Sequence, residues 1–222
     1  MRAAGGRRTA AALALLAAAA VCPAGALRAQ SLPFEAIPFG GVVLPVGKLV
    51  QQGTAQLSHP AAVTFGGRLD AWLTRSTAVE LVISYSVSGY HAVSSSGQVT
   101  DTTGALFAAT GRFVYRFATS GPVSWQVSAG AGVMAHSGSF LENLASSGRQ
   151  HLVGVVGLTG RLQVSEGTAL VLTAEDYVCS VKLSGIPGIA AAAHLNNYPM
   201  FSLGIVVPLG ARGEEEDYRT IR

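Results

Sequence analysis

The sequence alternates between apolar residues and polar or small residues over long stretches, a period of two that predicts β-strands. In the clearest stretch, residues 105–117, one face carries Phe107, Phe113 and Tyr115. The other face carries Leu106, Ala108, Thr110 and Val114 together with two arginines, Arg112 and Arg116. An alternation of about 11 residues is long enough for a tilted strand to cross a lipid bilayer.

Eight stretches of the chain follow this alternation, and we expect each to form one strand. They are residues 37–46, 63–73, 79–88, 105–117, 123–134, 154–164, 170–181 and 200–209. The first stretch is the least regular, because Pro38 and Pro45 interrupt it.

The seventh stretch changes its pattern at Asp176, which falls on the otherwise apolar face. A β-bulge there, or arrival of the strand at the membrane surface, would account for this carboxylate. We therefore expect Tyr177, Cys179 and Val181 to lie on the outer, apolar face.

The connections between these stretches alternate strictly between long and short. The long ones are residues 47–60, 91–103, 137–150 and 184–197, and the short ones are 75–76, 119–122 and 165–167. Eight antiparallel strands with both ends on the short-turn side produce this order. Short periplasmic turns and long external loops are typical of outer-membrane β-barrels, whereas a soluble sandwich has no reason to keep the alternation.

Residues 1–29 have the features of a secretory signal peptide. Arg2, Arg7 and Arg8 precede an apolar run, residues 10–21, and cleavage after Ala29 or after Ala26 fits the small residues that follow. Cleavage after Ala29 removes four of the 15 Lys and Arg residues and none of the 12 Asp and Glu residues, which leaves a net charge of −1. This balance gives no electrostatic support for nucleic-acid binding.

Composition also separates this chain from ordinary soluble domains. Apolar residues make up 49% of the sequence and charged residues 12%, about half the usual share, and the mean hydropathy is +0.40. After cleavage only Cys179 remains, so no internal disulfide can form. We expect an all-β fold: an eight-stranded antiparallel up-and-down transmembrane β-barrel at residues 30–210, preceded by the cleaved signal peptide and followed by a polar tail at 211–222.

This pattern resembles the small eight-stranded outer-membrane proteins, the family of OmpX and the OmpA transmembrane domain. The last stretch adds Ser202, Gly204, Val207 and Leu209, a spacing similar to the signal read by the barrel-insertion machinery. Leu209 stands where bacterial versions of that signal usually have a terminal aromatic residue. The resemblance implies an outer-membrane location in a Gram-negative-type bacterium, with membrane lipid and the insertion machinery as partners.

In this register a set of polar side chains faces the barrel lumen. They are Arg68, Asp70, Glu80, Arg112, Arg116, Gln126, Arg161, Gln163 and Glu175. Eight strands leave an interior that side chains nearly fill, and charges buried there must pair. A polar network that sets the register and closes the lumen is the leading interpretation; a gated ion pathway and a substrate site are the alternatives.

Most aromatic side chains fall on the outer face or near strand ends, as expected at a lipid–water boundary. They are Tyr85, Phe113, Tyr115, Phe117 and Trp125. Trp72 falls on the inward set, which indicates either a lumen plug or a one-residue error in register.

All five histidines fall in or beside the long connections: His59, His91, His136, His151 and His194. Across a hairpin, His136 and His151 would be neighbours; a divalent-metal site is one reading, and ordinary polar loop residues are the other. Lipid A deacylases use a histidine and a serine on a lipid-facing strand, and His136 with Ser139 is the nearest match, at the wrong spacing. We expect no metal, no cofactor and no catalytic residues.

The leading hypothesis is therefore a non-enzymatic outer-membrane barrel with a structural or surface-binding role, its long loops exposed outside. One alternative is a soluble exported barrel of the lipocalin type that holds a small apolar ligand. A lipid-modifying outer-membrane enzyme is the other. The sequence does not identify an external binding partner.

Overall fold

A computed structural model describes residues 34–46, 50–52, 55–93, 99–138, 150–165, 167–181 and 194–209. The predicted signal peptide and the predicted polar tail lie outside these residues. The described residues form ten strands and no helix. Within them, no helix has the length and apolar character needed to cross a membrane.

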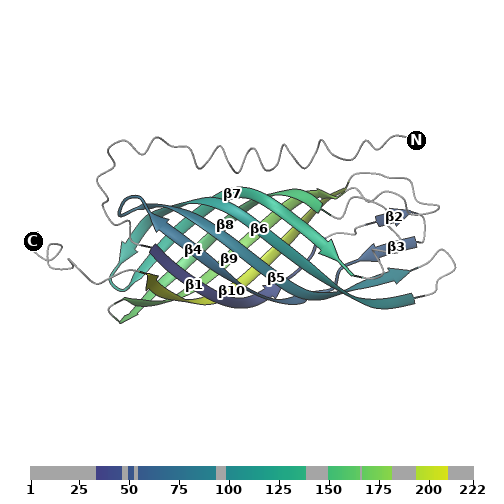
Figure 1. Cartoon of the computed structure of the whole chain (residues 1–222), viewed down its shortest axis with the longest axis horizontal. Coiled ribbons are helices and arrows are strands. Elements are labelled where there is room, and N and C mark those ends of the chain that lie inside the picture. The colour runs from purple at the N-terminus through teal and green to yellow at the C-terminus, as the bar shows by residue number, and fades with distance from the viewer. Residues whose placement is uncertain are drawn as a thin grey trace, which may run out of the picture. The chain divides into compact units, whose positions relative to one another are not determined.

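Eight of the strands form the wall of a barrel (Figure 1). They are β1 (Phe34–Val43), β4 (Ala62–Trp72), β5 (Thr77–Val93), β6 (Val99–Ser120), β7 (Val123–Ser137), β8 (Gln150–Ser165), β9 (Thr168–Val181) and β10 (His194–Leu209). Each pairs antiparallel with its neighbours in chain order, and β10 pairs with β1. The sheet therefore closes without a free edge in the wall, as predicted.

The two ends of the barrel differ. At one end, the short-turn end, tight turns join β4 to β5, β6 to β7 and β8 to β9. Two of these turns place Gly121 and Gly167 at φ angles of 56° and 81°, a left-handed conformation that glycine adopts without strain. Phe34 and Leu209, the first and last residues of the wall, pair at this same end. Both observations agree with the predicted alternation of connections.

The opposite end, the long-connection end, carries additional β-structure (Figure 1). The short strands β2 (Val50–Gln52) and β3 (Ala55–Ser58) pair with each other, and β3 pairs with the far end of β5. Strands β5 and β6 continue their own pairing to Val93 and Val99. The connection predicted at residues 91–103 is thus mostly a hairpin of two extended strands.

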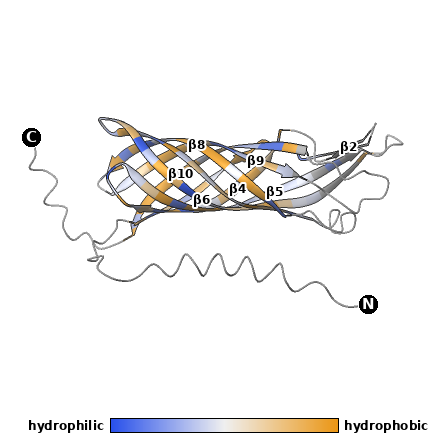
Figure 2. Ribbon diagram, turned by 90° about the horizontal axis from the view of Figure 1, so that it is seen from above, coloured by the Kyte–Doolittle hydropathy of each residue, from blue (hydrophilic) through white to orange (hydrophobic). Residues whose placement is uncertain are grey.

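The exterior of the barrel is apolar on every strand. Examples in chain order, all at least 38% exposed, are Phe34, Phe65, Ile83, Phe113, Val127, Leu158, Leu172 and Ile205. Figure 2 shows the resulting bands of orange, hydrophobic residues along the barrel strands. A lipocalin-type barrel would instead turn its apolar face inward around a ligand, so the soluble alternative is wrong for this fold.

The seventh predicted strand differs from the expectation at Asp176. The pairing of β9 with β8 and β10 runs through Asp176 without a bulge. Tyr177 and Cys179 therefore face the lumen, each 2% exposed, rather than the outside. The interior at this level is lined by large apolar and aromatic side chains, which removes the polarity contrast on which the sequence prediction relied.

Candidate functional site

The centre of the lumen holds a cluster of two arginines and two glutamates, which we call the central ion cluster: Arg68, Arg112, Glu80 and Glu175. Glu175 forms ion pairs with Arg112 and, at 3.2 Å, with Arg68. Glu80 lies 3.6 Å from each of the same two arginines. The four charges balance, which offsets the cost of burying each of them.

Neutral side chains complete the hydrogen bonding of the central ion cluster. Tyr177 accepts a hydrogen bond from Arg112 at 2.6 Å and donates one to Glu175 at 3.2 Å. Arg68 donates to Ser202 at 3.1 Å, and Arg112 donates from Nε to Thr110 at 3.0 Å. The cluster therefore connects β4, β5, β6, β9 and β10 through the lumen.

A second group of interacting side chains lies nearer the short-turn end. It comprises three charged residues, Glu35, Arg116 and Arg161, together with Trp72. Arg161 donates two hydrogen bonds to Glu35, at 2.6 and 2.9 Å. Trp72 donates its indole N–H to the same carboxylate at 2.9 Å. The guanidinium of Arg116 stacks over the indole ring, 4.1 Å from its centroid, a cation–π arrangement. Trp72 is thus part of the lumen filling, and the predicted register is correct there.

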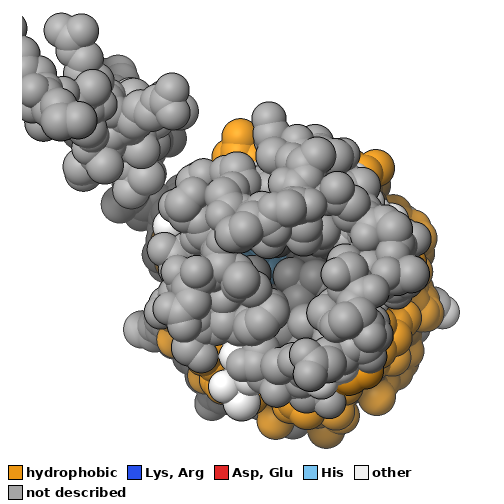
Figure 3. All heavy atoms as spheres, turned by 90° about the vertical axis from the view of Figure 1, so that its right-hand side faces the viewer, with side chains coloured by type: hydrophobic (Ala, Val, Ile, Leu, Met, Phe, Trp, Pro, Cys, Tyr) orange, Lys and Arg blue, Asp and Glu red, His pale blue; other side chains and the backbone are white. Residues whose placement is uncertain are grey.

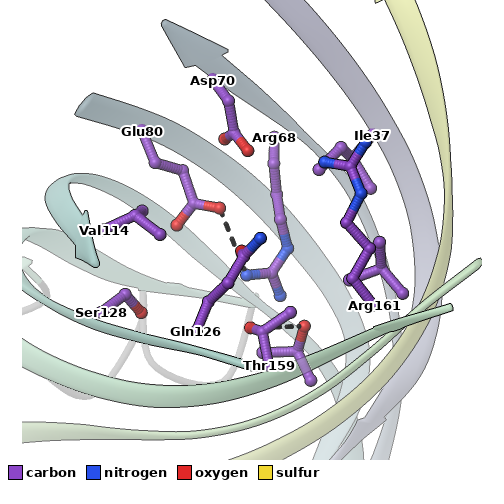
Figure 4. Close-up of a pocket in the computed structure, with 11 residues that line it drawn as sticks. Ile37, Arg68, Asp70, Glu80, Val114, Gln126, Ser128, Thr159 and Arg161 are labelled. Carbon is purple, nitrogen blue, oxygen red and sulfur yellow. Dashed lines mark hydrogen bonds and ion pairs between the residues drawn. The ribbon is translucent and has the colours of Figure 1, made fainter. Parts of the chain in front are cut away.

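Asp70 lies directly opposite Glu80 on the neighbouring strand, and both side chains face the lumen. Figure 4 shows Asp70, Glu80, Gln126 and Ser128 around a small cavity. The cavity has a volume of ≈ 10 Å³, room for about one water molecule. The atoms Asp70 Oδ1, Gln126 Nε2 and Ser128 Oγ have no hydrogen-bond partner in the protein, so their polar surface suits a bound water.

The predicted lumen residues differ in how deeply they lie. The most buried, all at most 6% exposed, are Arg68, Asp70, Glu80, Arg112, Gln126 and Glu175. Arg116 and Arg161 are half-buried at the short-turn end. Gln163 is exposed, and its amide donates to the carbonyl oxygens of Ser165 and Thr168 in the turn. Its predicted position in the lumen is wrong, because β8 has left the lumen at that point.

Sequence reasoning missed Glu35, the carboxylate partner of Arg161. The first strand was predicted to begin at Ile37, whereas β1 begins at Phe34. Glu35, Ile37 and Phe39 occupy every second position and all point inward. This spacing was the signal in the sequence that could have identified Glu35. Glu35 is the fourth lumen carboxylate and balances the four lumen arginines.

Three histidines form a layer across the lumen toward the long-connection end. The ring of His136 lies 5.4 Å from those of His59 and His151, measured between centroids, which confirms the predicted proximity of His136 and His151. His59 shares a hydrogen bond of 2.8 Å with Ser88. It lies in the connection before β4, and burial lowers its pKa to about 4, so this ring is neutral at neutral pH.

The predicted histidine chemistry can be checked against this geometry. His136 is 3% exposed and faces the lumen, whereas the deacylase arrangement requires a lipid-facing histidine. Ser139 lies outside the described residues. Among the described residues, no group of three or more His, Cys, Asp or Glu side chains is arranged to hold a metal ion.

The residues of the predicted insertion signal lie along β10. Ser202 and Gly204 face the lumen, and Val207 and Leu209 are exposed on the outer face. A side chain at Gly204 would approach Ile37 Cγ2 and the carbonyl oxygen of Pro38 to 2.9 Å. The small residue therefore allows β10 and β1 to close the barrel at this point.

Comparison with known proteins identifies the fold. No family model and no curated protein sequence matches the chain. The outer membrane protein OprG from Pseudomonas aeruginosa is similar in structure, with 12% identity and a TM-score of 0.52 over 81% of this chain and 98% of OprG. The outer membrane protein AlkL, solved in lipid bilayers, gives 16% identity and a TM-score of 0.53 over 88% of this chain and 98% of AlkL.

Neisserial surface protein A is a third example, with 15% identity and a TM-score of 0.51 over 78% of this chain and 96% of that protein. Similarity at this level of identity shows the fold. The chain has the fold of the small eight-stranded outer-membrane β-barrels, and its apolar exterior is the one that such a barrel presents to lipid.

Proposed function

We propose that this chain is a non-enzymatic integral protein of the outer membrane of a Gram-negative-type bacterium. In this proposal the barrel is a rigid anchor, and the parts beyond its long-connection end serve binding or envelope integrity. The observation that carries the proposal is the combination of an apolar exterior on all eight strands with a lumen filled by paired charges.

The filled lumen favours an anchor over a pore. The central ion cluster joins opposite parts of the wall, and the cavity beside it has a volume of ≈ 10 Å³. A space of that size holds about one water molecule. Ions would have to displace buried, paired guanidinium and carboxylate groups to pass, which costs several kcal/mol for each group left unpaired.

The long-connection end supports a surface role. There β5 and β6 continue beyond the level at which other wall strands end, and β2 and β3 add to the same sheet (Figure 1). If short turns face the periplasm, as is usual for such barrels, this extended sheet faces outward. A projecting sheet supported by a rigid barrel offers a stable surface for a partner outside the cell.

Two partners follow from this assignment: membrane lipid along the apolar exterior, and the barrel-insertion machinery during assembly. The proposed recognition segment is Ser202, Gly204, Val207 and Leu209 on β10. Val207 and Leu209 are the outward pair of this segment, so a partner that approaches from the lipid side would contact them.

Cell fractionation and gel mobility test this proposal. The mature protein should be recovered with outer membranes, require detergent for extraction, and migrate faster on SDS gels before heating than after. Recovery in a detergent-free periplasmic extract would contradict the proposed location. The acyl-chain pattern of lipid A should be the same with and without the protein, and a change that disappears with His136→Ala would contradict the non-enzymatic assignment.

A further inference from the structure

Every sulfur-containing side chain that follows the predicted signal peptide lies in one part of the lumen. They are Met134, Cys179 and Met200, each at most 2% exposed and all in the same buried cluster. The histidine layer adjoins this cluster. Thioether, thiol and imidazole groups are the side chains that bind soft metal ions, so their concentration here calls for a chemical explanation.

One of the sulfur-containing side chains, Met134, lies beside two histidines of the histidine layer. Met134 on β7 pairs with His151 on β8, and both point into the lumen; side chains directly opposite in an antiparallel pair are about 5 Å apart at Cβ. His136 lies two residues beyond Met134 on the same face of β7, and its ring is 5.4 Å from that of His151. Two imidazoles and one thioether therefore share one small region of the wall.

The ring of His136 is held in place from outside this region. Tyr198 on β10 shares a hydrogen bond of 3.1 Å with His136 Nε2, which fixes the orientation of that ring. His151 is 8% exposed, and its Nε2 atom is buried without a hydrogen-bond partner. A buried polar atom without a partner is costly, and coordination of a metal ion would satisfy it. Orientation of a ligand histidine by a second hydrogen bond is a usual feature of metal sites.

We propose that His136, His151 and Met134 form a binding site for a soft monovalent metal ion of the Cu⁺ or Ag⁺ type. The donor set favours this class, because thioether sulfur is a soft ligand that selects ions such as Cu⁺. A single positive charge also costs less to bury than a double one when no carboxylate is among the ligands. This site does not depend on the proposed anchor role.

The site lies toward the long-connection end of the barrel. Figure 3 views the barrel from the long-connection end and shows pale blue histidine side chains at its centre.

Titration of the folded mature protein in detergent with Ag⁺, a redox-inert probe, tests the proposal. The background variant is Cys179→Ala, which removes the thiol as a competing ligand. We expect about one Ag⁺ per chain, and a loss of affinity of at least about 10-fold in both His151→Gln and Met134→Leu. Met134→Leu conserves volume, so the barrel should fold, which heat-dependent gel mobility verifies.

Matched variants separate this site from other metal-binding groups. Met200→Leu removes a buried thioether of the same cluster, and His91→Gln removes an exposed imidazole; neither should change Ag⁺ affinity. Loss of binding in Cys179→Ala itself would overturn the proposal in favour of a lone thiol. Equal affinity of the Cys179→Ala protein with and without Met134→Leu would overturn it as well, as would tighter binding of Zn²⁺ than of Ag⁺.

Discussion

Arg112 on β6 and Glu175 on β9 form an ion pair in the lumen although 63 residues separate them in the sequence. Neither side chain has any solvent-exposed surface. Glu175 also binds Arg68 on β4, so one carboxylate connects three strands of the wall. We infer that Glu175 is the residue on which the closed lumen depends most.

Replacement of this carboxylate should destabilise the barrel strongly. Glu175→Gln leaves Arg68 and Arg112 buried with too few negative charges, and removal of one partner of a buried pair costs about 3–5 kcal/mol. The free energy of unfolding in urea, measured for the protein folded in detergent or vesicles, should fall by that amount. The midpoint of heat-dependent gel mobility should fall with it.

The matched control is the next residue, Asp176, which carries the same group on the opposite face of β9. Asp176→Asn should leave the free energy of unfolding within about 1 kcal/mol of the parent value, because polar substitutions away from buried networks have small effects. Equal losses for Glu175→Gln and Asp176→Asn would contradict the assignment of these two carboxylates to the lumen and the outer face.

The central ion cluster should also determine whether the barrel conducts ions. The parent protein should stay near background conductance in planar bilayers. Simultaneous Arg112→Ser and Glu175→Ser removes one positive and one negative charge and shortens both side chains, which widens the lumen without adding net charge. We expect discrete conductance steps from this double variant. Conductance by the parent equal to that of the double variant would show that the lumen is open already.

The inward position of Cys179 predicts a protected thiol. This side chain is 2% exposed, so a maleimide should modify it only after heating in SDS unfolds the barrel. Ser180→Cys in a Cys179→Ala background places the thiol on the exposed face, one residue further along β9, and should be modified in the folded protein. Mass spectrometry measures both rates; equal rates would place Cys179 outside, where the sequence pattern had predicted it.

The sequence predicted most of the wall because a lipid environment imposes a strict contrast between the two faces of a strand. In residues 63–73, 79–88, 105–117 and 123–133, outward apolar residues alternate with inward residues that are mostly polar or small, and the observed register agrees. The sequence of residues 91–103 lacks this contrast. For that reason the extensions of β5 to Val93 and β6 to Val99 were predicted as a loop.

The contrast also disappears where the lumen itself is apolar. Tyr177 and Cys179 face inward among Met134, Met200 and Tyr198, and nothing in their own polarity distinguishes that environment from lipid. Pairing between the lumen charges could not be predicted either, because it depends on the stagger between strands that are not neighbours in the sequence. The local pattern identified the charged residues, and only barrel closure determined that Glu175 lies between Arg68 and Arg112.

The central claim, an apolar face toward lipid and a polar face toward the lumen, is tested most directly by the two tryptophans of the chain. Trp125 is 44% exposed on the outside and Trp72 is 5% exposed in the lumen, and both lie near the short-turn end. Trp125→Phe and Trp72→Phe leave one tryptophan each, and brominated phospholipids quench tryptophan fluorescence on contact. We predict strong quenching when only Trp125 remains and little quenching when only Trp72 remains; equal or reversed quenching would contradict the account.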